Sequence, residues 1–202
     1  MSCKIVFATG NEGKMKEVRE ILADLGLPVL SMKEAGIHVD VDENGTTFME
    51  NARIKAAAVH AACGEIVLAD DSGLVVDAMD GAPGVYSARW MGEDTSYEIK
   101  NQAIIDRLEG LQGQERSARF VCSIAAVFPD GTKAETEGAV EGEIAFHPAG
   151  EGGFGYDPIF FLPERGVTTA ELTAEEKNAI SHRGRALRKM EPIIRAWLEE
   201  HA

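Results

Sequence analysis

Two adjacent aspartates, Asp70 and Asp71, follow the apolar run Ile66–Ala69 and precede Ser72. The run does not alternate with polar residues, which predicts a strand buried on both faces and ending at the aspartates. Ligands of open α/β sheets bind beyond the carboxyl ends of strands, where carboxylates could hold Mg²⁺ or orient a water molecule. Because adjacent side chains of an extended chain point in opposite directions, we expect the two carboxylates to have different roles. The structural alternative is a turn in which one aspartate caps backbone N–H groups.

A glycine-containing segment follows the first predicted strand and opens the first predicted helix. Its residues are Thr9, Gly10, Asn11, Glu12, Gly13 and Lys14. The N-terminus of a helix presents free N–H groups and partial positive charge, and a lysine adds a full charge, so the segment could bind phosphate. It is not a Walker A loop, because the spacing of that motif is absent and Met15 follows Lys14. A plain strand-to-helix turn is the structural alternative.

An acidic segment before the second predicted helix contains Asp40, Asp42 and Glu43. Taken alone, it is typical of a solvated loop in an acidic protein. It gains a functional role only if a metal ion at Asp71 needs a second carboxylate ligand.

The glycine-rich segment 152–158 brings Phe154, Gly155, Tyr156 and Asp157 together. An aromatic ring between glycines can present its face to a flat ligand, and the last two residues add polar groups. The alternative is a loop whose aromatic side chains pack as a local plug.

Basic residues gather at Lys177 and at Ser181–Arg185, although the protein as a whole is acidic. These side chains could contact phosphate or the acceptors on the edge of a base. Positive charge around a helix terminus is the structural alternative. His182 has no second histidine at metal-ligand spacing, so no zinc site is indicated.

Composition narrows the class of protein. The 202 residues suit one domain spanning residues 1–202, and 45% hydrophobic residues are enough for a core. The net charge of −14 argues against a nucleic-acid-binding surface, which needs a basic face. The three cysteines are far apart and form no disulfide or zinc pattern, which fits a reduced cytoplasm. No apolar run approaches the length that spans a membrane, so we expect no membrane partner.

Periodicity and turn residues predict helices and strands in mixed order. Strands are expected at residues 4–8, 66–69, 119–128, 133–145 and 159–163. A first helix is expected after the segment Thr9–Lys14 and up to about Asp24. Capping boxes at Thr47 and Thr95 predict helices that end at about Cys63 and about Leu111. Two further helices are expected, one beginning at Thr173 and one over residues 183–200. Residues 27–46 are expected to be irregular, and Pro192 is expected to kink or interrupt the last helix. The fold class is therefore α/β with a mixed sheet.

Five sequence blocks resemble, in order, the inosine/xanthosine triphosphate pyrophosphatases, which remove dITP, ITP and XTP. The blocks are ATGNEGK (8–14), TTFMENARIKA (46–56), ADDSGLVVDAMDGAPGVYSARW (69–90), GGFGYDPIF (152–160) and ELTAEEKNAISHRGRAL (171–187). Together they span nearly the whole chain, which makes the match far more specific than any single glycine motif.

The resemblance implies a two-lobed α/β domain with a long mixed sheet flanked by helices, a central nucleotide cleft and a homodimer. It implies a cytoplasmic enzyme that hydrolyses dITP, ITP and XTP or dXTP with Mg²⁺ or Mn²⁺. Cleavage between the α- and β-phosphates would give the monophosphate and pyrophosphate. Carried over by motif, Thr9–Lys14 would hold the triphosphate, Asp71 would be the catalytic carboxylate and a metal ligand, and Ser72 would contact the nucleotide. The purine pocket would consist of Phe154, Gly155, Tyr156, Asp157, Lys177, His182 and Arg183.

One position departs from the family pattern. Gap-free alignment places Asp42 where the family often has a metal-binding glutamate, so Asp42 is the expected second metal ligand. Aspartate is one methylene shorter, so Asp42 could bind the metal through water, or Glu43 could replace it.

Other functions remain open at the level of sequence. A purine nucleotide sensor would bind without turnover, and a different NTPase would release the γ-phosphate. An interaction protein that uses its acidic surface would bind no nucleotide specifically.

Overall fold

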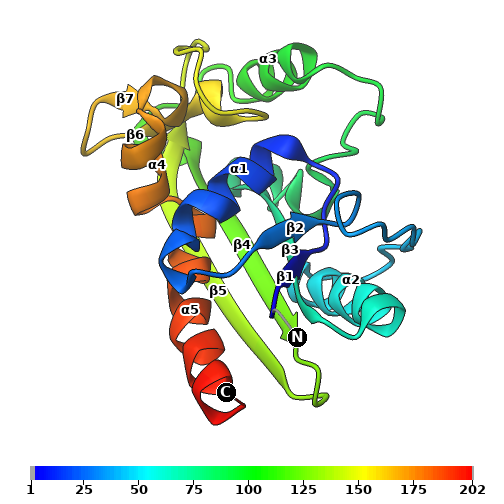
Figure 1. Ribbon diagram of the computed structural model, residues 1–202. Coiled ribbons are helices and arrows are strands. Elements are labelled where there is room, and N and C mark those ends of the chain that lie inside the picture. The colour runs from blue at the N-terminus through cyan, green and yellow to red at the C-terminus, as the bar shows by residue number, and fades with distance from the viewer. Residues whose placement is uncertain (1–2, 202) are drawn as a thin grey trace. The chain divides into compact units, whose positions relative to one another are not determined.

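A computed structural model describes residues 3–201 (Figure 1). The strands in this range are β1 (Ile5–Phe7), β2 (Val29–Ser31), β3 (Ile66–Val76), β4 (Ser117–Val127), β5 (Lys133–Ile144), β6 (Phe160–Leu162) and β7 (Val167–Thr168). The α-helices in this range are α1 (Glu12–Ile21), α2 (Phe48–Cys63), α3 (Tyr97–Arg107), α4 (Ala174–Ile180) and α5 (His182–Glu200). No helix among these is long and apolar enough to cross a membrane.

The strands form a seven-stranded sheet in the order β2-β1-β3-β4-β5-β6-β7. β2 and β3 both pair in parallel with β1, with Ile5 opposite Val29 and Ile66. β6 pairs antiparallel with β5 and with β7. The sheet is therefore mixed, which confirms the predicted fold class.

The chain divides into two compact units. The first comprises the described residues of Met1–Asp71, Cys122–Gly138 and His182–Ala202, and the second comprises Ser72–Val121 and Ala139–Ser181. β3, β4 and β5 each contribute residues to both units. Two units agree with the expected two-lobed chain, whereas the nucleotide cleft stays a prediction.

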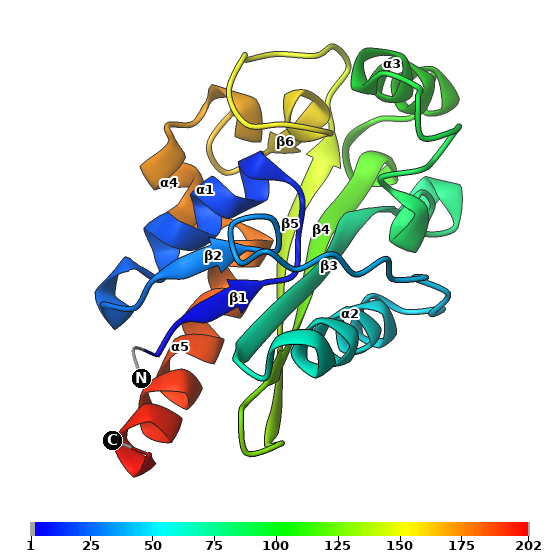
Figure 2. The same ribbon diagram turned by 45° about the vertical axis from the view of Figure 1, so that its right-hand side comes forward.

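Helices cover both faces of the sheet in the first unit, because alternate residues of a strand point to opposite sides. Phe7 and Leu68 are buried in one cluster with Val18 of α1 and Leu187 of α5. Val6 belongs to a second cluster, which includes the alanine-rich face of α2. Figures 1 and 2 show α1 and α5 on one side of β1 and α2 on the other. Adjacent residues of β3 therefore meet different helices.

Side-chain caps fix where α1 and α2 begin. The Asn11 side chain accepts a hydrogen bond from the Lys14 backbone N–H at 3.1 Å, which satisfies one free donor of the first turn. Thr47 and Glu50 form the predicted capping box of α2. α2 ends at Cys63 and is capped by Gly64, whose φ of 66° is left-handed and is tolerated best by glycine.

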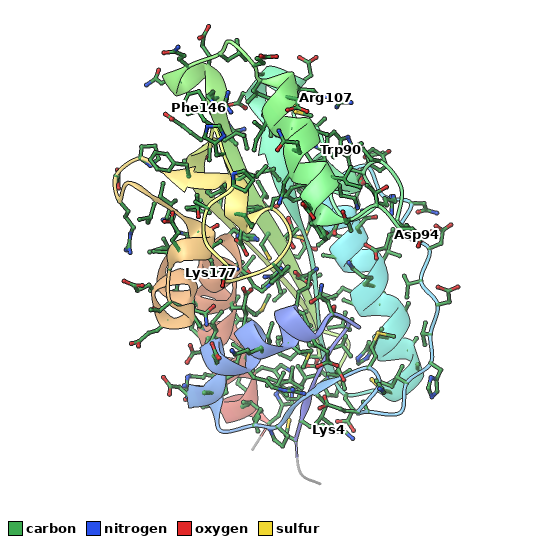
Figure 3. All side chains as sticks on the ribbon, turned by 90° about the horizontal axis from the view of Figure 1, so that it is seen from above. Lys4, Trp90, Asp94, Arg107, Phe146 and Lys177 are labelled. Carbon is green, nitrogen blue, oxygen red and sulfur yellow. The ribbon has the colours of Figure 1, made fainter. Side chains whose placement is uncertain are left out.

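The second unit has its own core, in which Ile104 of α3 lies with Leu74 and Phe160 from the sheet. At the surface of α3, the Arg107 guanidinium lies 4.9 Å from the centroid of the Trp90 ring, and Figure 3 shows the two side chains close together. These contacts hold α3 on the segment that follows β3.

Two predictions about strands were wrong. The strand predicted to end at Ala69 continues to Val76, so Asp70 and Asp71 lie within β3 rather than beyond its end. Their polarity interrupts the apolar run, but both find polar partners and the strand continues into Leu74–Val76. Residues 27–46, predicted to be irregular, contain the short strand β2, whose three residues are too few to show a period.

Two predictions about helices also need correction. α5 is not interrupted at Pro192, because one helix spans His182–Glu200, whereas the kink stays a prediction. Pro192 is exposed, so water can satisfy the carbonyl that loses its hydrogen bond. α3 is capped by Ser96 and not by Thr95, whose hydroxyl donates to the Met91 carbonyl at 2.7 Å instead.

Candidate active site

Asp70 is buried in an ion-pair cluster on the α1 and α5 side of the first unit. Its carboxylate accepts hydrogen bonds from Lys14 Nζ at 3.1 Å and from Arg183 Nη2 at 3.0 Å, and Arg183 also pairs with Glu17. Burial opposes the charged form of Asp70, but Lys14 and then Arg183 outweigh it and hold the pKa of this carboxyl well below its usual range. Asp70 is therefore a charged residue of β3 whose ion pairs connect this strand to α1 and α5.

Asp71, the next residue, meets α2 instead. Asn51 Nδ2 donates to Asp71 Oδ2 at 3.0 Å, and Lys55 Nζ lies 3.8 Å from Asp71 Oδ1. Burial raises the pKa of Asp71, with Glu43 adding to the rise and Lys55 and Asn51 opposing it. The two adjacent carboxyl groups thus contact different helices, which confirms that they point to different environments, and their pKa values are displaced in opposite directions.

Asn51 and Lys55 were not among the residues predicted to form the site. They lie one helical turn apart on α2, so their side chains share a face, and both are turned toward β3. The i, i+4 spacing and the shared block TTFMENARIKA (46–56) relate the two residues in the sequence, but neither signal reveals what they face.

The acidic segment before α2 meets the same lysine. Lys55 Nζ lies 2.8 Å from Glu43 Oε2, so one ammonium group is shared by Glu43 and Asp71. Asp70, Asp71 and Glu43 together raise the pKa of Lys55 although burial lowers it, and the lysine is therefore charged at neutral pH. Asp42, the predicted metal ligand, is exposed.

The residues around Lys55 suit a divalent cation. Two carboxylates already share one positive charge there, and their oxygen atoms are ligands of the kind that Mg²⁺ prefers. Across residues 3–201, no three His, Cys, Asp or Glu side chains gather as a complete metal site. Mg²⁺ commonly takes one or two protein carboxylates and completes its shell with water and substrate phosphates, so two carboxylates are compatible with it.

The predicted phosphate segment Thr9–Lys14 joins β1 to α1 in the first unit. Helix α1 begins within it, at Glu12, and the Asn11 N–H bonds to the Thr9 hydroxyl at 3.1 Å. The segment therefore presents a helix N-terminus, as predicted, with Lys14 in its first turn.

The glycine-rich loop of the second unit is fixed by Asp157. This buried carboxylate accepts hydrogen bonds from Lys177 Nζ at 2.6 Å, from the Phe154 N–H at 2.8 Å and from the Thr169 hydroxyl at 2.8 Å. Lys177 Nζ also lies 4.8 Å from the centroid of the Phe154 ring. Gly153 is required, because its φ is 71° and a Cβ would lie 2.2 Å from Asp157 Oδ2.

Tyr156 agrees with the alternative in which the aromatic side chains of this loop pack into the protein. Its ring is buried in the core of the second unit and meets Tyr97 edge-on at a centroid distance of 5.2 Å. Its hydroxyl donates to the Ser87 carbonyl at 2.7 Å, and burial raises the pKa of the phenol. Asp157 is likewise committed to internal contacts rather than presented as a free polar edge.

The remaining predicted residues are divided between the units. Ser72 is a half-buried residue of β3 and belongs with Phe154–Asp157 and Lys177 to the second unit. His182 and Arg183 are buried in the first turn of α5 and belong to the first unit. Each unit thus contains part of the predicted purine pocket, and the pocket itself stays a prediction.

The mixed sheet covered by helices defines an α/β protein, and Asp71 beside Lys55 on β3 is its candidate active-site carboxylate. The model of the Ham1 family matches residues 5–193, and the chain therefore belongs to the Ham1 family.

Curated relatives and solved structures match this chain over almost its full length. The dITP/XTP pyrophosphatase of an Exiguobacterium species is 48% identical over 191 residues, covering 95% of this chain and 96% of that protein. The dITP/XTP pyrophosphatase of Thermus thermophilus is 50% identical over 187 residues, covering 93% and 89%. The Ham1 protein structure from Coxiella burnetii superposes with a TM-score of 0.86 at 41% identity, covering 96% of this chain and 99% of that chain. That from Staphylococcus aureus gives 0.84 at 41% identity, covering 98% and 100%.

Proposed function

We propose that this protein hydrolyses the non-standard purine nucleoside triphosphates dITP, ITP and XTP or dXTP to the monophosphate and pyrophosphate. The observation that carries the proposal is Asp71, a largely buried carboxylate of raised pKa held between Asn51 and Lys55. The family and the names of the relatives supply the substrate class.

Asp71 has the properties of a proton acceptor for the attacking water. A general base is most effective when its pKa lies closer to the working pH than that of an ordinary carboxyl group, and burial shifts Asp71 in that direction. Lys55 favours the ionised form of the carboxylate, because its charge opposes the effect of burial on the pKa of Asp71. The same lysine can neutralise negative charge that develops on the phosphate.

Phosphate binding falls to Thr9–Lys14. The N–H groups at the start of α1 and the Lys14 ammonium would contact the triphosphate, and Ser72 would contact the nucleotide. Lys14 is paired with Asp70 in the structure, so this carboxylate would orient the lysine and share its charge.

The cofactor that suits these residues is Mg²⁺, with Mn²⁺ as a substitute. When bound, the cation would neutralise phosphate charge and stabilise the transition state. Asp71 and one carboxylate of the acidic segment would hold it. Asp42 is the ligand predicted from alignment, whereas the contact of Glu43 with Lys55 favours Glu43.

Purine recognition is assigned to the loop at Phe154–Asp157 and to Lys177, His182 and Arg183. Hypoxanthine and xanthine carry a 6-oxo acceptor, which a cationic donor favours, whereas adenine presents a donor there and would leave the hydrogen bond between the cation and the base unmade. In the structure Arg183 is engaged by Asp70 and Glu17, and Lys177 is engaged by Asp157, so either cation would contact the base while it keeps a carboxylate partner.

The test is to incubate the purified protein with Mg²⁺ and dITP, dGTP or dATP and to resolve the products by ion-exchange chromatography. We expect dIMP and pyrophosphate from dITP, and little product from the other two. dIDP and orthophosphate would instead identify a γ-phosphatase. Nucleotide binding without product would identify a sensor, and no specific binding would favour an interaction protein. Equal use of dGTP would contradict the purine pocket.

We also propose that residues 1–202 form one functional domain, that the enzyme acts as a homodimer, and that it works in the cytoplasm. These proposals follow from the family resemblance, and the acidic composition supports the absence of a nucleic-acid partner.

A further inference from the structure

Asn51 is a buried amide next to the carboxylate that we propose acts on water. It lies in the first turns of α2 and is 1% exposed. Burying an amide is unfavourable unless its donor and acceptor groups are satisfied, so a buried asparagine on a helix needs specific partners. Both ends of this amide have them.

The two partners determine which way the amide points. The Gly45 backbone N–H donates to Asn51 Oδ1 at 2.8 Å, and Asn51 Nδ2 donates to Asp71 Oδ2 at 3.0 Å. A backbone N–H can only donate, so it must face the amide oxygen. The amide nitrogen is then directed at the Asp71 carboxylate.

The hydrogen bond between Gly45 and Asn51 leaves no room for a side chain at residue 45. A Cβ at residue 45 would lie 2.7 Å from Asn51 Oδ1 and 2.8 Å from the Cβ of Glu50, so a larger residue would displace the asparagine or the segment. Glu50 holds the next residue through the Thr46 N–H at 2.7 Å. The end of the acidic segment is thus attached to α2 by consecutive backbone N–H groups.

We propose that Asn51 is a positioning residue that fixes the Asp71 carboxylate and links it to Gly45, which follows the acidic segment. The terminal torsion of an aspartate is broad, so a carboxylate needs a directed hydrogen bond to hold one orientation. Asn51 supplies that bond at Oδ2, and Lys55 lies at Oδ1. This inference rests on the proposed function, because it takes Asp71 as the group that acts on water.

Two substitutions, one at each partner, disrupt the hydrogen bond between Gly45 and Asn51. Asn51→Ala removes the amide, and Gly45→Ala leaves the amide but crowds its oxygen. Each should lower kcat for dITP by about tenfold or more while KM changes by less than about threefold, because the loss falls on the orientation of Asp71. Asn44→Ala is the matched control, since Asn44 is exposed in the same segment and should leave both constants unchanged. A kcat within about twofold of wild type in folded Asn51→Ala protein would overturn the proposal.

Amide hydrogen exchange tests the link without activity. The Gly45 N–H should be protected in the ligand-free wild type, and Asn51→Ala should speed its exchange by about tenfold or more. Asp71→Ala should also speed it, because the asparagine loses the partner at its other end, whereas Asn44→Ala should not. An unprotected Gly45 N–H in the wild type would contradict the link even if the protein hydrolyses dITP. If the wild type has no activity, the proposed function fails, and the exchange result still decides whether the link exists.

Discussion

Asp70 and Asp71 are neighbours in the chain, yet their carboxylates have opposite electrostatic environments. Asp70 is bonded to Lys14 and Arg183, and its pKa is depressed. Asp71 meets Asn51 and a more distant Lys55, and its pKa is raised because burial dominates. A strand that alternates its side chains between two covered faces is sufficient to separate a structural carboxylate from the one that we propose acts on water.

The role of Asp71 can be tested by a nearly isosteric change. Asp71→Asn keeps the shape and an acceptor for Asn51 but removes the base, so turnover of dITP should fall by about 10²–10⁴-fold. Circular dichroism should show an unchanged fold. Asp80→Asn is the control, because Asp80 is exposed and its φ of 52° is one that asparagine also tolerates. Near-normal turnover by Asp71→Asn would remove Asp71 from the mechanism.

The elements that position the site are joined through β3. Lys14 comes from α1 and Arg183 from α5, and both converge on Asp70, so one buried carboxylate ties two helices to the strand. On the other face, α2 is tied to the same strand by Asn51 and Lys55. The ion pairs and hydrogen bonds that support the site therefore also hold the layers of the first unit together.

Removing the Asp70 charge should destabilise the protein in a pH-dependent way. At neutral pH, Asp70→Asn should lower the free energy of unfolding by about 3–5 kcal/mol, because it leaves buried positive charge without its partner. The folded pKa of Asp70 is depressed, so its contribution is complete above the unfolded pKa of about 3.9 and is lost as the pH falls toward the folded pKa.

Urea unfolding of wild type and Asp70→Asn at neutral and acidic pH measures this effect. The difference between the two proteins should narrow by about 1 kcal/mol at about pH 3. Asp80→Asn should track the wild type at each pH. A difference that stays constant on acidification would show that the charge of Asp70 is not what stabilises this cluster.

For the whole molecule, the sequence predicted features that depend on neighbouring residues better than contacts between residues far apart in the chain. The capping box at Thr47 and the strand-to-helix segment at Asn11 depend on residues a few positions apart, and the structure contains both. The hydrogen bond from Asn51 to Asp71 joins residues 20 positions apart and was not predicted, because helix periodicity indicates which face is buried but not its partner. β2 was missed because a three-residue edge strand carries no period.

The proposed function makes pyrophosphate the leaving group, and the central claim is therefore that water attacks the α-phosphorus of the nucleotide. The most direct test is hydrolysis of dITP with Mg²⁺ in water enriched in ¹⁸O, followed by mass spectrometry of both products. We expect one ¹⁸O atom in dIMP and none in pyrophosphate. Label in pyrophosphate, or in orthophosphate released with dIDP, would contradict the account.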